Sequence, residues 1–186
     1  HTPLALSKLA AMLSAAALYA LLQEAGTVLF LGGVYGYGDL SRPIQSMSRF
    51  RNCAHFLTVG QGLASVILIR VAAAVFFACL LFCVGMCVKN GGTALAVSAA
   101  ALGAGYLCYQ TIPLRGGLNW LKCVNPFYCW SVSAALGEYL NLDLFGAPVN
   151  KDACALAILG SLAVLLPTAG TLVFNRTYQV KSSSRL

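Results

Sequence analysis

Glu24 and Arg70 are the residues whose type and position most strongly suggest chemistry. Each falls inside a long apolar run, where an ionisable side chain is costly and usually faces the interior of a helical bundle. Glu24 could line a polar pathway. Alternatively, it could lie near the membrane face, or its carboxyl group could be protonated. For Arg70 we favour anchoring, because its long stem can reach the headgroups from about 10 Å inside its helix.

Three cysteines in the second apolar run raise the possibility of a metal site. Cys79, Cys83 and Cys87 recur every four residues on one helix face, and three thiolates can bind Cu(I). No His or Met from a loop supports them at ligand spacing, and thiols in lipid stay protonated. We therefore interpret them as small packing residues and expect no metal and no cofactor.

Other reactive residues lie in patterns that do not form an active site. Cys53 and His55 are near neighbours without a third orienting group, and Asn175–Thr177 is a glycosylation sequon that abuts an apolar run. The sequence contains no phosphate-binding glycine loop and no metalloprotease or serine-hydrolase motif. We expect no catalytic residue.

The elements that must position these residues are four apolar runs of about 20 residues or more, enough for a helix to cross a bilayer. Charged residues make up only 9% of the chain, against about 25% in soluble domains. The sequence predicts an all-α, polytopic transmembrane helical bundle in one domain, residues 1–186, with interfacial or re-entrant helices. The runs are Leu9–Phe30, Leu63–Val88, Thr93–Ile112 and Ala153–Phe174.

The first two links between the runs differ in character. Residues 39–62 form a polar connector, and we expect a short amphipathic helix within Ile44–Leu57. Lys89–Gly92 is a tight turn, so the second and third spans form an antiparallel hairpin. In the third span, Ala101 and Gly105 have the small-xxx-small spacing of close helix contacts, as do Ala99 and Gly103.

The last link, residues 114–152, is rich in aromatic residues and predicts a segment that lies along or dips into the membrane interface. Within it, Val132–Leu142 predicts a short helix. The fourth span contains Pro167, and Asn175–Leu186 forms a basic tail.

Orientation is left open by these segments. The connector and the tail are both net positive, which favours the cytoplasm for each of them. Three spans separate them, however, so either Asn125–Leu142 re-enters or crosses the membrane, or one basic segment is external. The net charge of +7 forms no dense patch and does not favour nucleic acid.

The chain starts with His1, and its first residues lack the charged start, short apolar core and small-residue cleavage site of a signal peptide. We therefore expect it to be a piece of a longer protein whose beginning is missing.

Several short stretches resemble bacterial type-2 ATP-binding-cassette (ABC) permeases, and the resemblance covers most of the chain. The stretches are YGDLSRPIQS (Tyr37–Ser46), FRNC (Phe50–Cys53), TVGQG (Thr58–Gly62), LKCVNPFY (Leu121–Tyr128) and EYLNLDLFGAPVN (Glu138–Asn150). These motifs are less specific than a phosphate-binding loop. The usual permease half has six spans, whereas four are visible here.

The resemblance implies a multi-pass exporter subunit in the bacterial plasma membrane, surrounded by lipid and working as a homo- or heterodimer. ATP hydrolysis would occur in a separate ATPase subunit. The coupling segment would be Phe50–Gly62, and ATPase contacts would come from Arg49, Arg51, Thr58 and Gln61. The transported substrate is not fixed.

Two other functions stay open at this stage. A membrane-embedded enzyme would require Glu24 or Arg70 to line a polar cavity that faces other ionisable groups. A non-transporting scaffold or sensor subunit would require only the spans.

Overall fold

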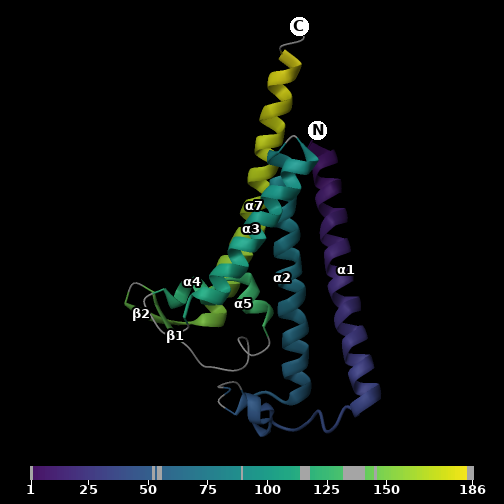
Figure 1. The fold of residues 1–186 in the computed structure, drawn as a ribbon, viewed down its shortest axis with the longest axis vertical. Helices are drawn as coiled ribbons and strands as arrows, with labels where there is room; N and C mark the ends of the chain where they lie inside the picture. The colour runs from purple at the N-terminus through teal and green to yellow at the C-terminus, as the bar shows by residue number, and fades with distance from the viewer. Residues whose placement is uncertain are drawn as a thin grey trace.

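The computed structural model describes residues 2–51, 53, 56–88, 90–113, 118–131, 141–144 and 146–183. Its four long helices are α1 (Thr2–Tyr35), α2 (Val59–Cys87), α3 (Gly91–Thr111) and α7 (Lys151–Ser183). Each contains a segment long and apolar enough to cross a membrane. The predicted all-α bundle with four spans is confirmed, and the protein is membrane-embedded (Figure 1).

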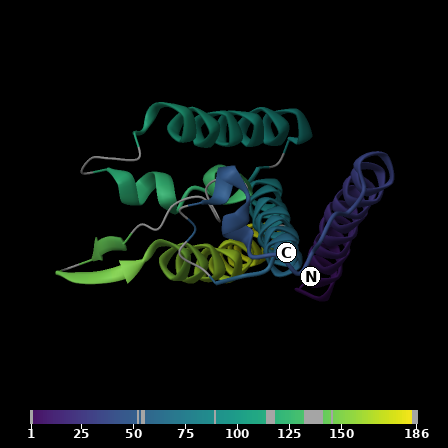
Figure 2. The same ribbon diagram turned by 90° about the horizontal axis from the view of Figure 1, so that it is seen from below.

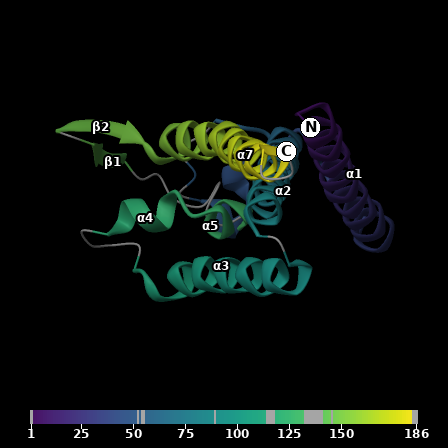
Figure 3. The same cartoon turned by 90° about the horizontal axis from the view of Figure 1, so that it is seen from above.

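The helix at the centre of the bundle is α2. It packs most extensively against α7 and α1, and less against α3 (Figure 3). In α2, 33% of the span is buried, against 6% to 11% in the other three. Most apolar side chains of α1, α3 and α7 therefore face outward, where lipid is their natural solvent.

The α2–α7 contact is close because a glycine lies in it. A Cβ atom at Gly170 of α7 would stand 3.2 Å from the Cα atom of Cys83 on α2, tighter than ordinary van der Waals contact. Cys79, on the same helix as Cys83, is only 1% exposed. These contacts fit the interpretation of Cys79 and Cys83 as packing residues, whereas Cys87 is exposed.

The connector between α1 and α2 closes on itself. Pro43 and Thr58 form an antiparallel bridge, and the Ile44 amide donates to the Leu57 carbonyl at 2.9 Å. Ile44, Cys53 and Val66 form a small core beneath this bridge. Figure 2 shows the connector running from the end of α1 to lie beneath α2.

The predicted amphipathic helix within Ile44–Leu57 is wrong. Two single-turn 3-10 helices, η1 (Ile44–Ser46) and η2 (Ser48–Phe50), stand there instead, separated by Met47 in an extended conformation. The extended conformation of Met47 interrupts the run of helical hydrogen bonds, so each helical segment ends after a single turn.

The chain folds back into the bundle after α3, which ends at Thr111, two residues ahead of Pro113. Two short helices follow, α4 (Asn119–Cys123) and α5 (Pro126–Trp130). The ring of Phe127 on α5 lies 5.0 Å from that of Phe77 on α2 and 5.8 Å from that of Tyr106 on α3. The aromatic rings therefore place α5 between α2 and α3.

The polar anchor of α5 is Asn125, which is buried. Its amide donates to the carbonyl of Gly105 at 2.8 Å, about 9 Å inside the end of α3. The small-xxx-small prediction is thus correct for Gly105 only in part, since its close neighbour is the Phe127 ring of α5 and not another long helix. Open space surrounds Gly103. The described part of the aromatic segment thus packs alongside the spans through α5.

A β-hairpin, which the sequence analysis missed, precedes α7. Strands β1 (Asn141–Leu144) and β2 (Ala147–Asn150) pair antiparallel across a turn in which Gly146 has φ +83°. Asn141 and Leu142 therefore belong to a strand, which corrects the helix predicted over Val132–Leu142; residues 132–140 of that helix lie outside the described residues. The hairpin projects away from the long helices (Figure 3).

Both chain ends lie at one end of the bundle, and the connector lies at the other (Figure 1). The helices α2, α3 and α7 separate the connector from the tail, and the tail continues α7 as far as Ser183. The two basic segments therefore lie at opposite ends of the bundle.

Candidate functional site

The candidate site is an ion pair between α1 and α2. Glu24 stands eleven residues before the end of α1 at Tyr35, and Arg70 stands eleven residues after the start of α2 at Val59. The two helices are antiparallel (Figure 1). Both side chains therefore lie at one level, about 16 Å from the connector ends of their helices.

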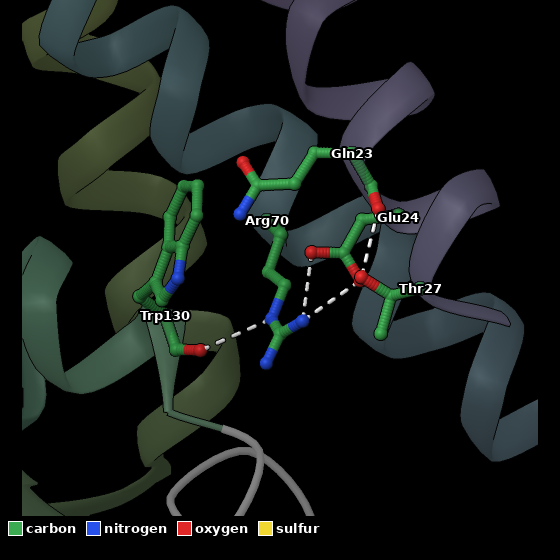
Figure 4. Close-up of polar contacts among 5 residues, drawn as sticks. All are labelled: Gln23, Glu24, Thr27, Arg70 and Trp130. Carbon is green, nitrogen blue, oxygen red and sulfur yellow. Dashed lines mark hydrogen bonds and ion pairs between the residues drawn. The ribbon is translucent and has the colours of Figure 1, made fainter. Parts of the chain in front are cut away.

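The geometry of the pair is close. Nη1 of Arg70 lies 2.7 Å from both Oε1 and Oε2 of Glu24 (Figure 4). The Glu24 side chain is 7% exposed and that of Arg70 is 23% exposed. Burial on this scale makes each partner dependent on the other, because an unpaired charge has no water to solvate it.

Trp130 adds a third element to the site. The Nε atom of Arg70 donates to the main-chain carbonyl of Trp130 at 3.4 Å. Trp130 is the last residue of α5, where helix carbonyls lack partners within the helix and carry partial negative charge. Arg70 thus connects α1, α2 and the short helix α5.

Two polar neighbours of Glu24 on α1 differ in their bonding. The Thr27 hydroxyl donates to the Gln23 carbonyl at 2.8 Å, a bond within the helix. The Gln23 side chain is exposed and makes no hydrogen bond to another described residue. Figure 4 shows it extending from α1 toward Trp130, alongside the Arg70 side chain.

The structure corrects the interpretation of Arg70 as a headgroup anchor. Its guanidinium points across to Glu24, because the antiparallel neighbour offers a carboxylate at 2.7 Å. Glu24 is buried in the bundle, as expected for an ionisable group that faces the interior. The part of Trp130 could not be predicted, since its carbonyl becomes a partner only through the position of α5.

The predicted ATPase-coupling residues lie at the connector end, separate from this pair. Arg51 is exposed beside η2, and Arg49 is part of η2, with its side chain outside the described residues. Thr58 and Gln61 form a capping box at the start of α2. The main-chain N–H of Gln61 donates to Oγ1 of Thr58 at 3.2 Å, and the main-chain N–H of Thr58 donates to Oε1 of Gln61 at 3.0 Å. Their side chains therefore already serve the end of the helix.

Asp39 begins the same connector and is fully exposed. Hydrogen bonds from the hydroxyl and the amide of Ser41 lower the pKa of Asp39 below its ordinary value of 3.8, with a smaller contribution from Arg42. The guanidinium of Arg42 lies 3.6 Å from the carboxylate. Nothing in this local cluster reaches the Glu24–Arg70 pair.

The ion pair limits the chemistry of the site. Within the described part of the chain, no third ionisable side chain bonds to the pair, and no three His, Cys, Asp or Glu side chains gather as metal ligands. An acid and a cation that neutralise each other lack the orienting group that general base or nucleophilic catalysis requires. The arrangement is suited to holding helices together and to presenting hydrogen-bond donors inside the membrane.

Comparisons of the chain with protein-family models, with curated proteins and with solved structures find no match.

Proposed function

We propose that this chain is the membrane-spanning subunit of an ATP-driven exporter of the type-2 ABC permease kind, working as a dimer of permeases with a separate ATPase. The sequence stretches that resemble such permeases support this proposal, and so does the bundle of four apolar spans. The helices would provide the path, and the partner would hydrolyse ATP.

The observation that carries the proposal is the ion pair at mid-helix. Charged residues inside spans are expensive, and they mark pathways or moving contacts more often than simple scaffolds. Glu24 and Arg70 connect α1 to α2, and Arg70 also contacts the short helix α5. In a transporter, such a contact could hold α1, α2 and α5 together in one state and be broken in another.

The enzyme alternative receives no such support. It requires further ionisable groups around Glu24 or Arg70, and the described residues provide none bonded to the pair. A scaffold would not stimulate ATP hydrolysis by an ABC ATPase, whereas a transporter subunit would. The test therefore uses the ATPase.

The test uses co-expression with the ABC ATPase that we expect to be encoded beside this chain. Wild-type chain should copurify with the ATPase and stimulate its hydrolysis in lipid vesicles. Charge reversal at the connector, R49E with R51E, should abolish copurification if the connector is the coupling surface. The matched control is R176E with K181E, which reverses two charges at the opposite end of the bundle.

The outcomes separate the possibilities. Loss of copurification only in the connector variant supports coupling through the connector, residues 39–62. Loss only in the control variant would place the ATPase at the end with the chain termini and would overturn the coupling segment while keeping the transporter. Absence of both copurification and stimulated hydrolysis with wild-type chain would reject the proposed function.

A further inference from the structure

Two polar groups beside the ion pair lack hydrogen-bond partners among the described residues. They are Nη2 of Arg70, which carries two N–H donors, and the side-chain amide of Gln23. Both stand at the level of the spans, where water is scarce and unpaired donors are costly. These donors are therefore available to a hydrogen-bond acceptor that approaches the ion pair.

The unpaired guanidinium nitrogen is open to an approaching molecule. Every fully buried side-chain nitrogen and oxygen atom in the described part of the chain has a partner, so the unbonded Nη2 belongs to the exposed part of Arg70. The Gln23 side chain is exposed as well. A molecule in the surrounding apolar phase can reach both groups.

Charge balance selects the class of that molecule. Glu24 already neutralises Arg70, so an anion would leave a net negative charge at low dielectric constant, at a large cost in free energy. An uncharged carbonyl oxygen can accept from Nη2 without this cost, and a hydrogen bond from a charged donor is stronger than a neutral one. An amide also offers an N–H group to the side-chain oxygen of Gln23.

We infer that Arg70 and Gln23 form a binding site for the carbonyl group of an uncharged amide or ester in an apolar molecule. Two sources carry this chemistry: the ester of a phospholipid, and an apolar amide that the protein transports. The second source rests on the proposed function, whereas the site itself does not.

The test measures carbonyl binding without any ATPase. The chain is placed in nanodiscs of diether phosphatidylcholine, which has no carbonyl group. An isotope-labelled probe is then added, either diester phosphatidylcholine or N-dodecylacetamide. The infrared carbonyl band of the probe reports a hydrogen bond to guanidinium as a shifted component that saturates at one probe per chain.

Three variants locate the site. Glu24→Gln with Arg70→Gln removes the guanidinium donors without changing net charge, and we expect about tenfold weaker binding. Gln23→Leu leaves the ion pair intact and should weaken amide binding about threefold, which keeps the test valid if the double variant misfolds. Thr27→Val is the control, because the Thr27 hydroxyl bonds only within its own helix, and it should bind like wild type.

Each outcome decides. A shifted band with the labelled ester supports the site with lipid as its occupant, and a shifted band with the amide alone supports a transported amide. No shifted band with either probe, or an equal band in wild type and in the double variant, would overturn the site. Since no ATPase is present, this failure is distinct from a failure of the proposed function.

Discussion

The two main contacts of α2 are held in different ways. Against α7, the contact depends on shape: Gly170 lets the backbone come close to Cys83, and no ion pair between described side chains joins the two helices. Against α1, the contact includes the buried ion pair of Glu24 and Arg70. In lipid, apolar surface alone gives little preference for another helix, so close fit and polar bonds must supply the specificity.

The difference indicates how each contact responds to change. A contact based on shape tolerates any substitution that keeps the volume, and its packing weakens by degrees. A contact based on a buried ion pair fails when one partner is lost, because the other partner is then an unsatisfied charge. We therefore expect the α1–α2 contact to be the more switchable of the two.

The largest effect should come from splitting the ion pair. Arg70→Ala leaves the buried Glu24 carboxylate unpaired, and we expect a loss of about 3–5 kcal/mol in the free energy of unfolding. Glu24→Gln with Arg70→Gln should cost much less, because it leaves no charge behind. Denaturant unfolding in mixed micelles measures both, and equal losses in the two variants would contradict the view that charge holds this contact.

A smaller effect should follow from filling the close contact. Gly170→Leu places a side chain where a Cβ atom alone would already stand 3.2 Å from Cys83, and overpacking of this kind costs about 1–3 kcal/mol. Gly160→Leu is the control on the same helix, because nothing lies within 4 Å of a Cβ atom there. If both variants unfold at the same denaturant concentration, the α2–α7 contact is not set by shape.

The smallest effect should come from the exposed charges of the connector. The hydrogen bonds from Ser41 lower the pKa of Asp39, so the stability they contribute is present above its ordinary value of 3.8 and is lost as pH falls through the lower folded value. NMR titration should show the pKa of Asp39 rising in Ser41→Ala. Because Asp39 is fully exposed, neutralising it should leave unfolding at pH 7 nearly unchanged. A marked loss of stability would contradict the view that the exposed pair of Asp39 and Arg42 contributes much less than the buried pair of Glu24 and Arg70.

The sequence was sufficient to predict the spans but not their contacts. Four long apolar runs with at most one charged residue well inside each determine four helices, because length and apolarity are local properties of the chain. The partnership of Glu24 with Arg70 depends on the pairing and register of two helices far apart in the sequence. Each residue could be recognised alone as costly, yet neither could indicate the other.

The connector and the hairpin were missed for a different reason. In the connector, the polar and apolar residues of Ile44–Leu57 fit a helix, but the bridge between Pro43 and Thr58 imposes a tight reversal that no local pattern records. The hairpin turns at Gly146, within a stretch whose short strands were interpreted as part of an interfacial segment. In both regions, pairing between residues apart in the sequence determined the backbone conformation.

The equal placement of Glu24 and Arg70 along their helices has a consequence for how the protein enters the membrane during synthesis. A single acidic or basic residue near the centre of a helix adds about 2.5–3.5 kcal/mol to the free energy of insertion. Threaded one at a time, α1 and α2 would each bear such a penalty. Entering together as a hairpin joined by the connector, they can form the ion pair before either meets lipid alone, so we expect the translocon to release the two helices as one unit.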